Sequence, residues 1–353
     1  MDLEVVRVLF KIGQLLALTP SSFENKTPSS AQKFYLFVLL LLSTFFSGVL
    51  SYYREPRYAE MAPLTGLLWR LNDVIRYLHN FYILVVVMIV KRGKWFQMID
   101  SLRKTECRMR PRRYISMMVL WHLVVGSLIA CLIRICVYFL GRHCPEQYTI
   151  EYFQWYSQFF YMFLSYQILR VVKSRYNHQR LQIRLTPKSD FLKYLKKFKR
   201  NICLLKKAVD AFNDIFGGSI LLNVLLASLK LFIYFINIIR SNLTPYGLEI
   251  TIFSIVSQIG LMMLLWLHIV YLLLMCDAIL QKFDAIFAAV YRFEATERTE
   301  VVLEEELVQD FVEFLHHNGP TFCAARFFTL TRSTIFHILN SLTTFLLVLI
   351  QVN

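Results

Sequence analysis

The sequence is poor in charged residues. They make up 18% of its 353 residues, and hydrophobic residues make up 56%. Soluble domains carry about 25% charged and about 45–50% apolar residues. The apolar residues gather in blocks of about twenty, the length of helix that crosses a hydrocarbon core about 30 Å thick. These features exclude an ordinary soluble domain and predict an integral membrane protein.

The sequence also lacks the patterns of metal, nucleotide and disulfide chemistry. Its seven cysteines show no zinc-type spacing, and Cys131 and Cys136 lie in the same apolar block. Zinc and disulfide frameworks both depend on regular cysteine spacing. No phosphate-binding glycine loop is present, and His268 and His337 occur singly in apolar blocks. We therefore expect no metal, no cofactor and no enzymatic activity.

We expect no cleavable signal peptide at the start of the chain. The first thirty residues mix acidic and basic side chains before the first apolar block, whereas a signal peptide places a basic start directly before an apolar run. We expect residues 1–33 to form a cytoplasmic N-terminal segment. Residues 34–353 are then expected to form a single seven-helix transmembrane domain.

The spans are predicted from hydropathy and length. They lie near residues 34–53, 64–90, 114–140, 152–172, 215–239, 250–275 and 334–351. The predicted fold class is therefore all-α, a polytopic membrane protein with seven transmembrane helices. The second span is too long for the bilayer core, at about 40 Å if helical. Its charged beginning, with Arg70, Asp73 and Arg76, is expected to project at one membrane face.

The net charge of +15 is confined to particular loops. Loops 91–113 and 173–207 are rich in lysine and arginine, while the loops on the other side carry only Arg54, Arg57, Arg142 and Arg240. The positive-inside rule then places the N-terminus in the cytoplasm and the C-terminus outside. This topology explains the charge without a nucleic-acid partner. It also argues against a G-protein-coupled receptor, whose N-terminus is outside.

Two of the predicted cytoplasmic loops have an amphipathic pattern. Residues 192–212 place apolar side chains at helical spacing with lysines opposite. We expect this helix to pack against other cytoplasmic helices, and binding to anionic lipid is the alternative. Residues 303–316 repeat the apolar pattern with acidic residues in place of lysines. The two helices either attract one another or leave their charges solvated.

Several outer-half residues are candidates for a small-ligand pocket, because ionisable groups inside spans are costly and aromatic faces with a few polar groups suit small ligands. A local ion pair is the alternative for the charges of span two, and snorkelling to the headgroups is the alternative for the arginine of span three. The candidates are Arg70, Asp73, Arg134, Tyr152, Trp155, Tyr156, Phe159, Ser257 and Gln258.

The last span has one face that could line a pore. Thr344, Val348, Gln351 and Val352 share this face, since they lie at i, i+4, i+7 and i+8. A ring of valines would exclude water from a closed pore. By spacing alone, ordinary helix packing with a buried glutamine explains the same pattern.

The chain resembles insect gustatory receptors over its whole length. Their last helix reads Thr-Tyr, five apolar residues and Gln-Phe, and residues 344–352 match it with Phe345 for the tyrosine and Val352 for the phenylalanine. Residues 327–332, Phe-Phe-Thr-Leu-Thr-Arg, are similar to the family's lead into that helix. Residues 213–217, Asn-Asp-Ile-Phe-Gly, are similar to the segment leading into the fifth span.

This resemblance implies a tastant-gated, nonselective cation channel in the plasma membrane, expected in the dendrites of sensory neurons. It implies a homo- or heterotetramer of gustatory receptor subunits with the seventh helix lining the pore, and an anchor domain built from cytoplasmic helix extensions. Val348 and Val352 would form the gate, with Gln351 beside the ion path and Thr344 on the same face. The ligand is expected to be a small-molecule tastant, with bitter compounds favoured over sugars. The alternatives are a non-conducting accessory subunit and a G-protein-coupled receptor.

Overall fold

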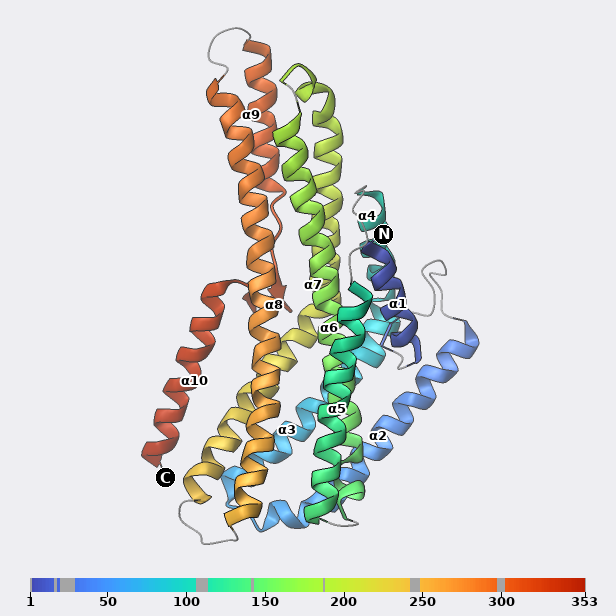
Figure 1. The fold of residues 1–353 in the computed structure, drawn as a ribbon, viewed down its shortest axis with the longest axis vertical. Coiled ribbons are helices and arrows are strands. Elements are labelled where there is room, and N and C mark those ends of the chain that lie inside the picture. Colours follow the sequence, from blue (N-terminus) through green and yellow to red (C-terminus); the bar gives the residue numbers. More distant parts are fainter. Residues whose placement is uncertain are drawn as a thin grey trace.

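The structure is a computed structural model, and it describes residues 2–15, 18–19, 29–105, 114–140, 143–186, 188–241, 248–296 and 302–352. Some side chains within these ranges, mainly near helix ends, are outside the description. The described chain is a bundle of helices with one short hairpin (Figure 1). In chain order the elements are α1 Asp2–Leu15, α2 Ser30–Ala59, α3 Pro63–Phe81, η1 Tyr82–Val90, α4 Arg92–Lys104, α5 Tyr114–Leu140, α6 His143–Leu185, α7 Lys188–Ser241, α8 Leu248–Thr296, α9 Val302–His317, β1 Cys323–Ala324, β2 Phe328–Thr329 and α10 Arg332–Val352.

Each predicted span lies within a helix of the structure, in α2, in α3 with η1, and in α5, α6, α7, α8 and α10. Among the described residues, four helical stretches are long and apolar enough to cross a membrane by composition alone. They are Ser30–Pro56, Pro63–Val90, Tyr194–Ile236 and Met262–Val290. The helices α6 and α10 carry more polar side chains, and these face the protein interior in α6 and one exposed side in α10.

The start of α2 and the join between α2 and α3 follow from local sequence. Ser29 caps α2 with its hydroxyl, which accepts from the backbone N–H of Gln32, and the Gln32 side chain accepts from the N–H of Ser29. This reciprocal arrangement satisfies two donors that a helix start leaves unpaired. The next helix, α3, begins at Pro63, because proline suits the first turn, where its missing N–H is not needed.

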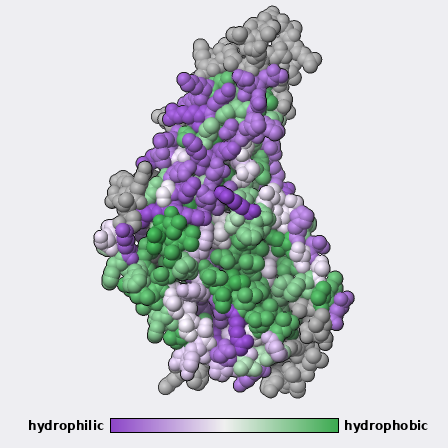
Figure 2. Space-filling model, turned by 180° about the vertical axis from the view of Figure 1, so that it is seen from behind, coloured by the Kyte–Doolittle hydropathy of each residue, from purple (hydrophilic) through white to green (hydrophobic). Residues whose placement is uncertain are grey.

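Three helices are much longer than a membrane is thick. With 43, 54 and 49 residues, α6, α7 and α8 are about 65, 80 and 75 Å long at 1.5 Å per residue. A bilayer core takes up about 30 Å of such a length. The rest forms a tall extension at one end of the bundle, which α9 joins (Figure 1). The surface of the extension is hydrophilic, and a broad hydrophobic surface lies below it (Figure 2).

The main core runs through this extension and the upper half of the bundle. Its largest fully buried side chains include Trp95 of α4, Tyr161 of α6 and Phe212 and Phe216 of α7. Leu9 and Phe10 of α1 belong to the same core. The N-terminal helix therefore packs against the bundle.

The stripe predicted over residues 192–212 is buried in this core. Its described members, Leu195, Phe198, Ile202, Leu205, Val209 and Phe212, are all at most 6% exposed. This burial confirms that the helix packs against other helices and does not lie on the lipid surface. The acidic helix α9 packs on α8 and α7 through Phe311 and Leu315. Lys206 contacts α9 by donating to the carbonyl oxygen of His317, and the predicted attraction between acidic and basic side chains stays a prediction.

Candidate ligand site and pore helix

Five charged side chains from four helices meet where α2 ends and where α3 and α6 begin. They are Arg54 of α2, Asp73 and Arg76 of α3, Glu151 of α6 and Lys230 of α7, and we call them the ion cluster. Arg54 Nη1 lies 3.2 Å from Asp73 Oδ1, and Arg76 Nη1 lies 2.7 Å from Glu151 Oε1. Arg54 also pairs with Glu151. Removing such charges from water is costly unless they are paired and hydrogen-bonded.

Aromatic side chains complete the surroundings of the ion cluster. The hydroxyl of Tyr58 donates to Asp73 Oδ2 at 2.7 Å, and Trp155 Nε1 donates to Glu151 Oε1 at 3.1 Å. Lys230 Nζ lies 3.2 Å from the centroid of the Trp155 ring. A cation over an aromatic face is stabilised by the ring quadrupole. Lys230 therefore interacts with the face of the Trp155 ring and, electrostatically, with the carboxylates of Glu151 and Asp73.

The ion cluster combines two guanidinium groups and a lysine with two carboxylates. Arg76 is 2% exposed, and its Nη2 atom has no hydrogen-bond partner among the described residues. A buried guanidinium donor without an acceptor is unfavourable. The site therefore has a spare guanidinium donor, which suits a ligand with an acceptor or an anionic group.

Deeper in the bundle, a chain of polar side chains continues from the ion cluster. Gln158 of α6 donates to Asn223 of α7, and Asn223 contacts His79 of α3, with 3.3 Å between Nδ2 and Nε2. His79 Nε2 is in turn 2.8 Å from the hydroxyl of Ser219. Hydrogen-bonded polar groups of this kind join helices inside a membrane. These polar contacts connect α3, α6 and α7 on the side of the ion cluster that faces the extension.

The predicted aromatic residues of α6 lie in a second group, between α5, α6 and α8. The Phe159 ring is 5.3 Å from His268 of α8, and His268 is 5.0 Å from Trp121 of α5, between ring centroids. The hydroxyl of Tyr156 is 3.4 Å from Nδ1 of His122. Ring pairs at these separations are favourable beyond the area they bury. Trp155 joins the two groups, since its ring is 5.8 Å from Phe159.

The structure brings together only part of the predicted pocket. Asp73 and Trp155 meet in the ion cluster, and Tyr156 and Phe159 lie in the aromatic group. Tyr152, beside Glu151 on α6, is half-buried. The side chains of Ser257 and Gln258 are outside the described residues.

The two predicted arginines lie away from the ion cluster. Arg134 is exposed on α5, as expected for a side chain that reaches the headgroups. Arg70 pairs with Glu55 on the surface, with 2.6 Å between Nη2 and Oε1. The expected projection of the charged beginning of span two therefore holds for Arg70 alone. Asp73 and Arg76 point into the protein, because carboxylates and cations of α2 and α6 pair with them there.

Four members of the ion cluster were missing from the predicted pocket, and of these Arg76 was predicted only to project at a membrane face. Lys230 lies within the predicted fifth span, and an ionisable residue inside a span is itself a signal of a functional site. Glu151 and Arg54 lie just outside predicted spans, where charges are ordinary. Their burial depends on the packing of helices that are far apart in sequence.

The helix α10 stands beside the bundle next to α8 (Figure 1). Its inner side is anchored by Leu342, which is 5% exposed, and by Ile335 and Ile338, which pack against the main core. Phe345 also touches the protein, since its ring lies 4.4 Å from Phe232 of α7. The helix is thus fixed along one side only.

The opposite side of α10 is exposed and largely polar, and we call it the polar face. It includes the predicted Thr344, Val348 and Gln351, all of which are exposed. The side chain of Val352 is outside the described residues. Helical spacing adds further exposed residues to the same face, namely His337, Asn340 and Ser341. Packing of this face within its own subunit, the alternative drawn from spacing alone, is contradicted by the exposure.

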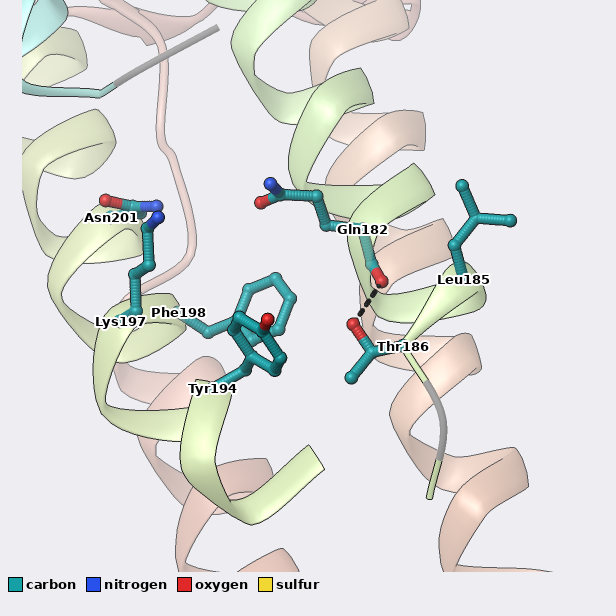
Figure 3. A pocket seen from close by; sticks show the side chains of 7 residues that line it. All are labelled: Gln182, Leu185, Thr186, Tyr194, Lys197, Phe198 and Asn201. Carbon is teal, nitrogen blue, oxygen red and sulfur yellow. Dashed lines mark hydrogen bonds between the residues drawn. The ribbon is translucent and has the colours of Figure 1, made fainter. Parts of the chain in front are cut away.

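A pocket of about 260 Å³ lies between α6 and α7 in the extension (Figure 3). Lys197 and Asn201 of α7 face Gln182 of α6 across it, and Thr186 bonds to the carbonyl oxygen of Gln182. Its other lining residues are Leu185, Tyr194 and Phe198. Along α6, Leu185 is 34 residues from Glu151, or about 50 Å at the helical rise. This pocket is therefore separate from the ion cluster.

Comparison with known proteins gives a family and a fold. The family described as 7tm Chemosensory receptor matches residues 6–353. A search among curated proteins gave no match. The fold is similar to the insect olfactory receptor OR5 from Machilis hrabei, with 12% identity, a TM-score of 0.61, and 99% of this chain and 98% of that chain covered. The same receptor in complex with eugenol gives 12% identity and a TM-score of 0.58, with the same shares covered. At this identity the likeness shows the fold, that of a seven-helix membrane protein.

Proposed function

Because the chain belongs to the 7tm chemosensory receptor family, we propose that it is a gustatory receptor subunit that forms a tastant-gated, nonselective cation channel. The family is one of receptors rather than of enzymes, and the chain is a multi-pass membrane protein. The pore is lined by α10, and the ligand is a small tastant, with a bitter compound as the favoured class. The channel works in the plasma membrane of sensory dendrites.

The observation that carries this proposal is the polar face of α10. Its amides, Asn340 and Gln351, are exposed in the subunit. An amide facing lipid cannot satisfy its donors and acceptor, so polar side chains within membranes face protein or a water-filled cavity. A second subunit alone would leave a polar seam, while several copies around an axis enclose a water-filled path. We infer an assembly of several subunits on this basis, and the resemblance to insect gustatory receptors implies that it is a homo- or heterotetramer.

Charge distribution supports the orientation of the channel. The hydrophilic extension carries the basic residues of α6 and α7 (Figure 2), which the positive-inside rule places in the cytoplasm. The ion cluster then lies near the outer face of the membrane, where an external tastant arrives first. Residues 34–353 form the channel domain in this account, and the N-terminal segment lies on the cytoplasmic side.

Expression in a cell without endogenous receptors tests the function. Currents are recorded during application of a panel of bitter alkaloids and sugars, such as quinine, caffeine and sucrose. We expect at least one compound to evoke a cation current that reverses near 0 mV. A subunit that conducts only after co-expression with another gustatory receptor is an accessory or obligate heteromeric subunit. Absence of current under both conditions contradicts the proposal.

Substitution of Gln351 by lysine is expected to lower the single-channel conductance for cations. A unit charge about 6 Å from a passing ion repels it by about 0.7 kcal/mol in water, or about threefold in occupancy. The matched control is Q351E, which reverses the added charge at the same position and is expected to leave the conductance equal or higher. Equal conductance in Q351K and Q351E would place Gln351 away from the ion path.

A further inference from the structure

Two segments that are far apart in sequence meet on one short stretch of α7. This stretch is residues 213–218, and it lies midway along the bundle. The hairpin that leads into α10 packs against one side of it, and the end of α3 with η1 packs against the other. We call residues 213–218 the joint.

On the first side, Asn213 holds the chain that leads into the hairpin. Its Nδ2 donates to the carbonyl oxygen of Thr321 at 2.6 Å, and its Oδ1 accepts from the N–H of Cys323 at 3.2 Å. One amide thus satisfies two backbone groups of a segment more than 100 residues away. Loss of this side chain would leave both groups without a partner.

The backbone of the hairpin also lies directly on Gly217. A methyl group added at Gly217 would come within 2.7 Å of the backbone nitrogen of Ala325 and 3.1 Å of the carbonyl oxygen of Cys323. Atoms this close must move apart, and backbone atoms have little room to do so. Glycine is therefore required here for the hairpin to reach α7.

The hairpin itself has an unusual turn. Ala325 and Arg326 have φ values of 49° and 66°. These values lie in the left-handed region, which residues other than glycine and asparagine rarely adopt. Such a conformation persists only where surrounding contacts hold it. The contacts with Asn213 and Gly217 are of this kind. The turn is therefore sensitive to movement of the joint.

The hairpin continues directly into α10. The hydroxyl of Thr334 donates to the carbonyl oxygen of Thr329 at 2.6 Å, which ties the first turn of α10 to β2. Arg332 at the start of α10 pairs with Asp277 of α8, with 2.5 Å between Nε and Oδ2. Because Thr334 joins β2 to the first turn of α10, a displacement of the hairpin moves the start of α10.

On the other side of the joint, Tyr82 inserts its ring against Gly218. A methyl group added at Gly218 would lie 2.5 Å from the Tyr82 ring. The Tyr82 hydroxyl donates to the carbonyl oxygens of Asp214 and Ile215 at 3.4 and 3.3 Å, and Lys91 Nζ donates to that of Asp214 at 2.6 Å. Tyr82 begins the π-helix η1, one turn and a half after Arg76 of the ion cluster. π-helical turns occur often at functional sites.

We propose that the joint, residues 213–218 of α7, transmits movement of α3 at the ligand site to the hairpin and so to α10. The inference rests on the proposed function. Arg76 and Asp73 are in the ion cluster and Tyr82 is in the same continuous helical segment, so a ligand that pulls on the cluster shifts or rotates the end of α3. The joint passes this shift across α7, because its two sides lie within about one and a half helical turns.

The test uses Gly217→Ala and Asn213→Ala in the full chain. Whole-cell current is measured with the panel compound that opens the unmodified receptor, and binding is measured as the shift in melting temperature that this compound causes in the solubilised receptor. G217A is expected to reduce the maximal current about tenfold or more, because the added methyl group forces the backbone of the hairpin away from the joint, while the binding-induced shift is retained. N213A is expected to act in the same direction without adding bulk.

Gly93→Ala is the matched control, since an added methyl group there meets nothing within 4 Å. It is expected to leave both current and binding unchanged. If G217A fails to reach the cell surface, the maximal current and the binding of N213A test the proposal. Full currents from N213A, or from G217A at equal surface density, overturn the joint while the channel function stands. If the unmodified chain never conducts, alone or with a partner subunit, the proposed function fails and the joint fails with it.

Discussion

Replacement of Glu151 by glutamine is expected to destabilise the folded receptor by about 3–5 kcal/mol, the usual cost of removing one partner from a buried ion pair. Glu151 is the common partner of Arg54 and Arg76. Glutamine has nearly the same shape, and its amide oxygen can still accept from Trp155 Nε1. The substitution therefore removes a charge and little else.

This loss is large compared with the 5–15 kcal/mol or so by which folded proteins are stable. We expect E151Q to show a clearly lower melting temperature in detergent and a strong fall in the amount of receptor labelled at the cell surface. Fluorescence-detected size exclusion after heating measures the first, and surface biotinylation measures the second.

Two further variants separate charge balance from general damage. E55Q breaks the exposed pair of Glu55 with Arg70 and is expected to change stability little, because solvent screens surface pairs. Combining E151Q with Lys230→Met removes one anion and one cation, so the double variant should recover part of the lost stability. A melting temperature of E151Q equal to that of the unmodified receptor would show that the ion cluster is not held by Glu151.

Substitution of Val348 by alanine is expected to leave the channel leaky without tastant. Val348 lies on the polar face of α10 and is 49% exposed in the subunit. A narrow ring of valine side chains around an axis excludes water from a closed pore, and smaller alanine side chains let water and ions return. The standing current should become comparable with the tastant-evoked current of the unmodified receptor.

The control for V348A is Leu339→Ala. Leu339 is also an exposed apolar residue of α10, at 47%, but helical spacing places it away from the polar face. L339A is expected to keep the closed state tight. An unchanged standing current in V348A, at equal surface density, would remove Val348 from the gate.

Hydropathy located the helices well, because backbone groups within a bilayer must bond internally and a long apolar run therefore has one solution. All seven predicted spans lie in helices. Hydropathy alone did not give the helix lengths, although the resemblance to gustatory receptors implied cytoplasmic helix extensions. Helix α6 runs on to Leu185 and α7 starts at Lys188, so most of the region predicted as a loop is helical. The polar residues between the fourth and fifth predicted spans do not distinguish a helix that continues from a span from a loop that contains a separate helix.

The ion cluster was predicted only in part because sequence does not fix the rotation of each helix. Asp73 and Trp155 were predicted as separate candidates, and only packing shows that Arg76 and Glu151 link them. The hairpin was not predicted from the sequence either. Hairpin turns with positive φ usually carry glycine or asparagine, and here the two residues with positive φ are Ala325 and Arg326. By contrast, the residues predicted to share one side of α10 do so, and those that are described are exposed, because helical spacing within one element is fixed by geometry.

The pore position of α10 is tested most directly by the accessibility of Thr344 to a cationic thiol reagent. In Thr344→Cys, a permanently charged methanethiosulfonate reagent applied from outside during tastant application is predicted to block the current irreversibly. The unmodified receptor and Leu339→Cys should be insensitive. A T344C current that survives the reagent while the channel is open, with Leu339→Cys blocked instead, would place the opposite side of α10 in the water and contradict the account.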